Sequence, residues 1–413
     1  MGRRVTQRLL ALGTSLTAGL RTLRRASTGT SPAFDLHYVR TGPRTSTPTV
    51  IIPGGPGLGS VLPYGTLRRI AARGGLDLIM VEHRGIGLSR TDLRGEDLPV
   101  SAMWIDEVLG DIAAVLDHER VDHAFIVGSS YGSYLASGFG VRYPDRVAGM
   151  LLDSALQTAS ELDLERRELR GRFWEGTGRV PTMVRALVEA GEDQRKLLDI
   201  VRAAFELGGN TLLEPLLHQR LTWVRRGRTF VSPTSGLAWR LLEMYATRDD
   251  SIAGFPGIYE FDLAGVIGFR ELGYGSPPDG LPLDPALTYA PLAPRFPAFA
   301  GEPFDLPAQT SEFTWPLVVL SGDRDLRTPT EIADRVVRSA QHATHVHLAN
   351  GHSALDTHPV ALLNAIRRLV AGQQASLPGI EAQLDRLPKR GIAARLPAIF
   401  TMALWVERLL GKR

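Results

Sequence analysis

Cysteine is absent from the 413-residue sequence. This absence excludes disulfides, thiol nucleophiles and zinc sites with cysteine ligands. No H-E-x-x-H motif or comparable cluster of metal ligands occurs either, so we expect neither a metal ion nor a cofactor. Long hydrophobic runs are also missing, while apolar residues make up 44% and charged residues 22% of the chain. These proportions exclude a disordered chain, a collagen and a protein with many membrane spans.

Acidic residues are missing from the beginning of the chain, where residues 1–34 contain six arginines. Residues 373–413 contain seven basic and three acidic residues, a net charge of +4. Because the whole chain carries +3, the body between these ends carries −7. An acidic body between basic ends is not typical of nucleic-acid binders. We therefore expect a small molecule or a short peptide as the partner, and no nucleic acid.

Each end of the chain contains a short apolar stretch. Residues 9–20 follow a basic start, as in a signal peptide, but Gly, Ser and Thr dilute the stretch and three arginines follow it. Residues 396–410 are fewer than the roughly 20 apolar residues that span a bilayer, and they favour a helix docked on the body over a membrane contact. We expect a cytoplasmic rather than a secreted protein, with peripheral membrane contact through the basic termini left open.

Short apolar runs alternate with helical patterns from residue 36 to residue 156. Leu76–Glu82 is a continuous apolar run, which is typical of a strand buried on both faces. Buried strands that alternate with helices predict an α/β fold with a mainly parallel sheet flanked by helices. The strands are expected at 36–40, 49–52, 76–82, 124–127 and 148–152, and the helices at 106–118 and 131–142.

This alternation is interrupted once. Between residues 157 and 312 the apolar residues follow helical spacing, with helices expected at 162–173, 181–189, 195–205 and 237–244. Strands return at 317–321 and 345–348, and Thr328–Glu331 has the pattern of a capping box that starts a helix. A last helix is expected at 359–370. The predicted parts are a basic N-terminal extension (1–35), a split α/β core (36–156 and 313–372), a helical cap (157–312) and a C-terminal helical extension (373–413).

The sharpest functional motif is Gly128-Ser129-Ser130-Tyr131-Gly132, which matches G-x-S-x-G. It lies between a predicted strand and a predicted helix, which is the context of a nucleophile elbow. The turn is so tight that small residues must flank the nucleophile, and it holds the Ser130 hydroxyl at the carboxyl end of the sheet. Ser129 is the rival in the same turn, but the glycine spacing favours Ser130.

A serine nucleophile needs a base, and the base needs an acid that orients it. In chains with this elbow the order is serine, acid, histidine. The acid is expected just after the strand at 317–321, where Asp325 is favoured over Asp323, because Asp323 directly follows the turn glycine and could brace the turn. Asp153, which follows the strand at 148–152, is a remoter alternative.

His352 follows a turn glycine after the last predicted strand and precedes a helix, which is the position expected of the base. His345 and His347 alternate with Val346 on a strand, so we expect them to be face residues. The order along the chain favours His352 as the base. The competing histidines are His342, His345, His347 and His358.

Acyl transfer also needs two backbone N–H groups that stabilise the oxyanion. The residue after the nucleophile, Tyr131, is expected to supply one of them. The second is expected from the loop Pro53–Gly57, which follows an early strand and whose glycines allow the backbone to approach a substrate oxygen. Gly55 is the favoured donor in this loop.

Five segments together resemble the α/β-hydrolase serine aminopeptidases, which include the proline iminopeptidases and the tripeptidyl aminopeptidases. The resemblance implies that Ser130 is the nucleophile, Asp325 the acid and His352 the base. It also implies that Gly55 and Tyr131 form the oxyanion hole and that Arg84 braces the site. The segments are PGGPG (53–57), EHRGIGLS (82–89), GSSYGSYLA (128–136), GDRDLRTP (322–329) and GHS (351–353).

The resemblance implies a serine hydrolase that forms an acyl-enzyme and releases N-terminal residues, including proline, from short peptides. A substrate ammonium needs a carboxylate in the pocket, because an unpaired buried ammonium is costly. The alternatives are a carboxylesterase or lactonase with the same triad, and a non-catalytic ligand receptor, which has no need of a complete triad. The cap carboxylates expected to bind the substrate are Glu175, Glu214, Glu243, Glu260 and Asp262. An esterase pocket would draw instead on Phe173, Trp174, Trp223, Trp239, Tyr245 and Phe255.

Overall fold

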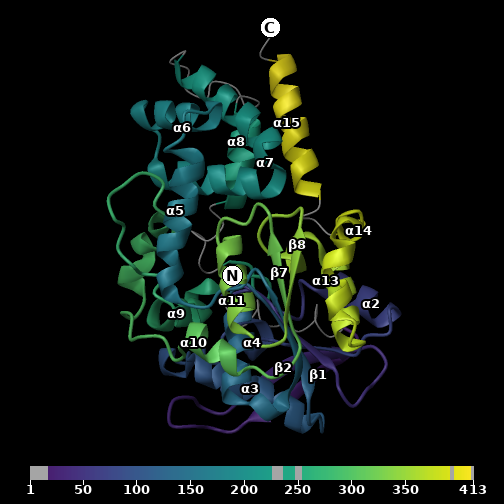
Figure 1. Cartoon of the computed structure of the whole chain (residues 1–413). Helices are drawn as coiled ribbons and strands as arrows, with labels where there is room; N and C mark the ends of the chain where they lie inside the picture. The colour runs from purple at the N-terminus through teal and green to yellow at the C-terminus, as the bar shows by residue number, and fades with distance from the viewer. Residues whose placement is uncertain (1–16, 226–235, 247–253, 391–394, 411–413) are drawn as a thin grey trace.

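The computed structural model describes residues 17–225, 236–246, 254–390 and 395–410 (Figure 1). The strands are β1 (Leu20–Arg25), β2 (Phe34–Thr41), β3 (Thr49–Ile52), β4 (Leu78–Val81), β5 (Ala124–Ser129), β6 (Val147–Asp153), β7 (Leu317–Gly322) and β8 (Ala343–Leu348). In these ranges they form one sheet in the order β1-β2-β4-β3-β5-β6-β7-β8. β2 pairs antiparallel with both β1 and β4, and the other pairs are parallel. The expected α/β fold with a mainly parallel sheet is confirmed.

The central strands are apolar because helices cover both faces of the sheet. Along β3, Val50 and Ile52 pack into the apolar core on one side, and Ile51 packs into the core on the other side. This alternation follows from the two-residue period of a strand. The first side is covered by α3 (Ile105–His118), α4 (Tyr131–Arg142) and α11 (Thr330–Ser339), and the second by α2 (Gly65–Arg73) and α13 (Pro359–Val370).

The register of the parallel strands brings their carboxyl ends to one edge of the sheet. In open α/β sheets, ligands bind at this edge. The segments that follow β3, β5, β6, β7 and β8 therefore meet at the place where a site is expected. The register pairs Ile52 with Gly128, Ser129 with Asp153, Asp153 with Leu320, and Gly322 with Leu348.

A helical insertion separates β6 from β7, and its described residues contain no strand of the sheet. The insertion has an apolar core of its own, to which Leu198, Val201 and Phe205 contribute. Two of its helices are joined at a kink at Gly209, where φ is 59°, a conformation that favours glycine. Its longer helices are α5 (Leu162–Phe173), α6 (Arg179–Glu189), α7 (Gln194–Arg225, which contains the kink), α8 (Leu237–Ala246) and α9 (Phe261–Glu271).

The predicted C-terminal helix is present as α15 (Leu396–Leu410). Figure 1 shows it beside α7 and α8 at the end of the molecule that carries the insertion. Phe400 and Leu404 of α15 belong to the apolar core of the insertion, so the helix docks on the body as expected. Within the described ranges, no helix combines the length and the apolar character needed to cross a membrane.

The N-terminal region differs from the expected basic extension. Leu20–Arg25 is an edge strand, β1, and its arginines form ion pairs with acidic residues of the core. Arg21 lies 2.6 Å from Glu119, and Arg25 lies 2.8 Å from Asp111. These side chains are thus committed to the core, because strand pairing brings them beside its carboxylates. The stretch 9–20, for which a signal peptide was weighed, lies outside the described residues up to residue 16.

Candidate active site

Ser130 lies in the turn between β5 and α4. Its φ of 54° and ψ of −122° are unusual for a residue with a side chain, and this strain is typical of a nucleophile elbow. The flanking glycines are required by space: a Cβ on Gly128 would lie 2.0 Å from the carbonyl oxygen of Gly132, and a Cβ on Gly132 would lie 2.2 Å from the carbonyl oxygen of Ile52. The space available at the turn therefore explains the two glycines of the motif.

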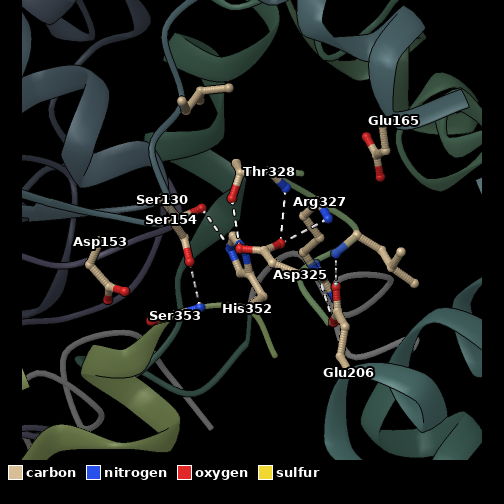
Figure 2. A network of polar contacts seen from close by, with 12 residues as sticks. Ser130, Asp153, Ser154, Glu165, Glu206, Asp325, Arg327, Thr328, His352 and Ser353 are labelled. Carbon is tan, nitrogen blue, oxygen red and sulfur yellow. Dashed lines mark hydrogen bonds and ion pairs between the residues drawn. The ribbon is translucent and has the colours of Figure 1, made fainter. Parts of the chain in front are cut away.

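His352 and Asp325 complete a hydrogen-bonded chain with Ser130 (Figure 2). The Nε2 atom of His352 lies 2.9 Å from the Ser130 hydroxyl oxygen. Its Nδ1 atom lies 3.0 Å from each carboxylate oxygen of Asp325. Asp325 follows β7 and His352 follows β8, so the two turns at neighbouring strand ends bring them together. This order of contacts is that of a Ser-His-Asp triad.

The Asp325 carboxylate is buried, and several protein groups donate hydrogen bonds to it. It accepts hydrogen bonds of 3.0 Å from the backbone N–H groups of Arg327 and Thr328, and one of 2.8 Å from the Thr328 hydroxyl. Burial acts to raise the pKa of Asp325, but the charge of His352 and these hydrogen bonds outweigh it and lower the pKa to about 2. Burial likewise favours the neutral ring of His352, yet the Asp325 carboxylate outweighs it and raises the pKa of His352 above its ordinary value.

The hydrogen bond from Thr328 to Asp325 corrects one prediction. Thr328 does not cap the following helix, because its hydroxyl is used by the carboxylate. The residue that precedes α11 is Pro329, which makes no side-chain capping bond. Glu331, the predicted partner in the capping box, instead forms an ion pair with Arg335 at 2.6 Å. The helix forms nearly where expected, but Thr328 serves the site.

Ser129 and Asp153, the rivals in sequence, form a separate buried pair. The Ser129 hydroxyl donates to Asp153 at 2.8 Å, and Asp153 also accepts hydrogen bonds of 2.9 Å from the N–H groups of Ala354 and Leu355. Burial raises the pKa of Asp153 to about 6. Asp153 therefore holds the segment that follows His352 and does not contact the imidazole through a hydrogen bond.

The remaining rivals lie away from Ser130. Asp323 is exposed and forms an ion pair of 3.1 Å with its neighbour Arg324. His345 bonds to the Ser321 hydroxyl at 2.8 Å. The ring of His347 stacks on that of His345 with the centroids 3.9 Å apart. The structure thus brings only His352 of the competing histidines within hydrogen-bond distance of Ser130, as far as the described residues show.

The predicted oxyanion donors, Gly55 and Tyr131, come from the loop after β3 and from the start of α4. Tyr131 is the first residue of α4, and the first N–H groups of a helix have no partner within the helix. Gly55 lines the same cavity as Ser130 and His352. Its neighbour Gly54 is so close that a Cβ there would lie 3.3 Å from the Cβ of Ser130. The loop after β3 therefore runs close to the nucleophile, on which the prediction of an oxyanion donor from this loop depends.

Arg84 is buried at the base of this region. It forms two hydrogen bonds of 2.7 Å with Asp111 and an ion pair of 2.9 Å with Glu107. The neighbouring His83 ring lies 3.1 Å from the Tyr131 hydroxyl, and burial lowers the pKa of His83 to about 4. This cluster links the turn after β4 to α3 and to the residue after the nucleophile.

Two adjoining cavities, of about 160 and 370 Å³, open above Ser130 and His352. Both are lined by core residues on one side and by the insertion on the other. The first is bounded on its insertion side by Glu161, Glu165, Arg202, Tyr274 and Tyr289. The second reaches Glu206, Tyr245, Tyr259 and Leu396, the first residue of α15.

On the insertion side Glu161 is buried, and Glu165 and Glu206 are half-buried. Glu161 accepts a hydrogen bond of 3.1 Å from the N–H of Gln157, and within the described ranges it forms no ion pair. Burial raises the pKa of Glu161 to about 8 and that of Glu165 to about 7. Glu165 lies 2.8 Å from Arg202, and Figure 2 shows it across the cavity from the triad. Glu206 lies 3.4 Å from Arg327.

The five carboxylates expected from the sequence do not line either cavity. Glu175 is exposed. Glu214 and Glu243 form ion pairs on the insertion with Arg179 at 2.6 Å and with Lys196 at 2.8 Å. Helical packing turns these three away from Ser130, so this part of the prediction is wrong.

Glu260 and Asp262 have a structural task instead. Glu260 is buried and accepts hydrogen bonds from the N–H groups of Gly87, at 2.6 Å, and Gly257, at 2.9 Å. Asp262 lies 2.9 Å from Arg90, which also contacts Glu260 at 3.2 Å. These contacts tie the insertion to the core loop that follows β4. The carboxylates of Glu260 and Asp262 are therefore already bonded to residues at this junction.

Sequence reasoning missed Glu161, Glu165 and Glu206. Each is one acidic residue among many on the insertion and belongs to no motif. Arg327 and Thr328, in contrast, lie in the segment GDRDLRTP that carries the family resemblance. The sequence therefore contained a motif that pointed to Arg327 and Thr328. The three glutamates are brought to the cavity by helix packing alone.

Comparison with known proteins places this geometry in a family. The family described as alpha/beta hydrolase fold matches residues 47–359. A probable proline iminopeptidase of Leptolyngbya boryana is 29% identical over 122 residues, which are 30% of this chain and 36% of that protein. The proline iminopeptidase of Arabidopsis thaliana is 27% identical over 122 residues, 30% of each chain. The match thus spans about a third of the length of these relatives.

Among solved structures, similarity is found at low identity. A thermophilic esterase from Thermogutta terrifontis is 17% identical, with a TM-score of 0.46 over 86% of this chain and 99% of that chain. The family match covers most of the sequence, including the segments that hold Ser130, Asp325 and His352. The chain therefore belongs to the α/β hydrolase fold family, whose members are generally hydrolytic enzymes.

Proposed function

We propose that this protein is a serine hydrolase that works through an acyl-enzyme. The observation that carries the proposal is the chain of hydrogen bonds from Ser130 through His352 to Asp325, at 2.9 and 3.0 Å, on the floor of a cavity. A serine at the tip of a strained turn, an imidazole and an ionised carboxylate are the three groups that acyl transfer requires.

The first step is the attack of the Ser130 hydroxyl oxygen on the substrate carbonyl carbon. His352 takes the hydroxyl proton on Nε2 as the new C–O bond forms, and the carbonyl electron pair moves onto its oxygen. Asp325 stays ionised because its pKa is held at about 2, so it stabilises the imidazolium and does not take the proton. The N–H groups of Gly55 and Tyr131 donate to the oxyanion.

The second half of the cycle returns the proton. When the tetrahedral intermediate collapses, the bond to the leaving amine or alcohol breaks and His352 protonates the leaving group. A water molecule then attacks the acyl-enzyme and loses its proton to His352 in the same way. When this second intermediate collapses, the bond between the Ser130 oxygen and the acyl carbon breaks, and His352 returns the proton to the Ser130 oxygen. The products are a carboxylic acid and the amine or alcohol.

We propose an aminopeptidase acting on short peptides as the favoured activity. The support is the buried Glu161 carboxyl, which lines the cavity above Ser130 together with the half-buried, arginine-paired Glu165. Burial raises the pKa of Glu161 to about 8, which means that the cavity disfavours its charge when no cation is present. A substrate ammonium beside it would supply the missing positive charge and would be stabilised in return.

A substrate panel tests this proposal. Prolyl and other aminoacyl arylamides with an unmodified amino group are compared with their N-acetylated forms and with p-nitrophenyl esters. We expect the unmodified amides to be cleaved and acetylation to reduce kcat/KM strongly, because acetylation removes the ammonium. Equal rates for both forms would contradict the aminopeptidase proposal and leave the serine hydrolase proposal intact.

An esterase is the second candidate, and a specific observation favours it. Glu165 and Glu206 already have arginine partners in the cavity, Arg202 at 2.8 Å and Arg327 at 3.4 Å. An ester without an amino group would leave these pairs intact. Of the aromatic residues expected in an esterase pocket, Tyr245 lines the second cavity. Preference for the esters in the panel would support this candidate.

A further inference from the structure

The outer face of α15 carries an exposed apolar stripe. The exposed fractions are 39% for Ile399, 61% for Met402, 60% for Trp405 and 48% for Leu409. These residues follow one another at intervals of three or four. At 100° per residue they fall within about 120° of the helix circumference. Four large apolar side chains that lie together at this exposure make the outer face of α15 a candidate interaction surface.

The opposite face of α15 accounts for its docking on the insertion. Phe400, Ala403 and Leu404 are buried in the apolar core that α7 and α8 form. The Phe400 ring lies 6.3 Å from that of Tyr245 on α8. The helix therefore needs none of its outer apolar residues to hold its place, and the stripe calls for another explanation.

The stripe is accompanied by positive charge. Between residues 386 and 410 the basic residues are Arg386, Lys389, Arg390, Arg395 and Arg408, and the acidic residue is Glu407. Glu407 is buried on the inner side, where it accepts a hydrogen bond from Gln219. The side chains of Arg390 and Arg395 are exposed just before the helix. Arg408 lines a surface hollow with His218 and with Arg179, which is paired there with Glu214. An apolar stripe beside exposed basic residues is complementary to a surface with an apolar interior and anionic groups on its outside.

The position of α15 relative to the cavity adds a second link. Leu396, its first residue, lines the cavity that also contains Ser130 and His352. A surface that covers the outer face of α15 would thus lie next to one wall of the reaction cavity. The apolar stripe is therefore close enough to the cavity for a surface bound there to lie beside the substrate's route to Ser130.

We propose that the outer face of α15 docks the protein onto an anionic lipid surface. Apolar side chains including a tryptophan enter the interface, and arginines contact the headgroups, as in other interfacial helices. The acidic body, with a net charge of −7 between residues 35 and 372, is repelled by such a surface, so this basic end faces it.

A second copy of the chain fits this face less well. A helix of 15 residues is about 22 Å long and about 10 Å wide, which offers about 220 Å² per chain. A stable dimer buries about 800 Å² on each partner. A two-fold contact along α15 would also bring Arg395 and Arg408 near their own copies in the partner, and like charges repel.

The test is co-sedimentation of the full chain with phosphatidylcholine vesicles that contain or lack phosphatidylglycerol. We expect binding to the anionic vesicles that weakens as salt is added. The double variant Met402→Gln, Trp405→Gln should lose about tenfold or more in partition coefficient, because both side chains leave the interface. The variant Arg395→Gln, Arg408→Gln should lose the preference for anionic vesicles.

A matched control is the double variant Leu281→Gln, Phe299→Gln, which changes two other exposed apolar side chains. It should bind vesicles as the wild type does, and all variants should keep the wild-type rate on a soluble substrate and the wild-type melting temperature. The proposal is overturned if the wild type does not bind, or if the Met402, Trp405 variant binds as strongly as this control. It is also overturned if the stripe variant changes only the oligomeric state in sedimentation velocity.

Discussion

The two walls of the cavity above Ser130 shift the pKa values of their carboxyl groups in opposite directions. On the core wall, Asp325 is buried and yet its pKa is lowered to about 2, because His352 and several donors surround it. On the insertion wall, burial raises the pKa of Glu161 to about 8 and that of Glu165 to about 7. Asp325 and Glu161 are both buried, so burial by itself does not decide the charge.

The difference lies in what each wall supplies. The turns after β7 and β8 supply the hydrogen bonds of Asp325, which need no substrate to form. Glu161 receives backbone hydrogen bonds but no ion pair from the described residues. The core wall is thus complete without a ligand, whereas on the insertion wall Glu165 is paired with Arg202 and Glu161 has no ion pair within the described residues. Changes to the first should affect every substrate, and changes to the second should affect cationic substrates alone.

The largest effect is expected from Ser130→Ala. The rate should fall by about 10^4-fold or more for amides and esters alike, because the nucleophile of the shared first step is gone. The measurement is kcat for both substrate classes. Ser129→Ala serves as the matched control, since Ser129 donates to Asp153 and not to His352. Loss of activity in the control and not in the Ser130 variant would reverse the assignment.

Asp325→Asn should lower kcat by about 10^4-fold, since the amide orients the imidazole poorly and does not stabilise its charge. The pH profile gives a second readout. Activity requires neutral His352, so it rises with pH through the pKa of His352, which lies above its ordinary value in the wild type. Without the Asp325 charge this pKa falls, and the acid limb should move to lower pH.

Asp153→Asn is the matched control for that shift. Asp153 lies at the end of the neighbouring strand and bonds to Ser129, Ala354 and Leu355. The substitution should cost about 1–3 kcal/mol in free energy of unfolding, because one buried donor loses its acceptor. The midpoint of the acid limb should move less than in Asp325→Asn, because Asp153 acts on His352 through its charge alone and not through a hydrogen bond. An equal shift in both variants would show that the two carboxylates share the role assigned to Asp325.

A smaller and selective effect is expected from Glu161→Gln. The amide keeps the shape and can still accept from Gln157, but it does not pair with an ammonium. We expect kcat/KM to fall about 10- to 100-fold for peptides with an unmodified amino group, the value of one charged hydrogen bond, and to stay unchanged for esters. Glu175→Gln, an exposed carboxylate outside the cavity, is the control. Equal losses on peptides and esters would remove the distinction between the two walls.

The smallest signal is a proton released on binding. At pH 7, Glu161 with a pKa of about 8 is mostly protonated, and an ammonium ligand favours its carboxylate form. Binding of an aminoacyl arylamide to the Ser130→Ala protein should therefore release up to about one proton. Calorimetry in buffers of different ionisation enthalpy measures this number. The release should disappear when Glu161→Gln is added, and its persistence would assign the proton to another group.

The core was largely predictable because local patterns and sheet packing agree there. The apolar runs predict β3 and β7 closely, and the glycine spacing selects Ser130 because no other residue fits at Gly128 and Gly132. β1 was missed, since its arginines read as a basic tail until the acidic partners on β2 and α3 are in place. Thr328 was predicted to cap a helix, but its hydroxyl donates instead to Asp325, three residues earlier in the chain.

The sequence by itself determined the order of serine, acid and histidine, each just after a buried strand. Parallel strands end at the same edge, so this order is enough to bring the three side chains together. Only the tertiary structure decided which carboxylates face the substrate. Helices of the insertion can turn any acidic residue inward or outward at the same composition, and their packing placed Glu161 and Glu165 in the cavity and committed Glu260 to the junction with the core.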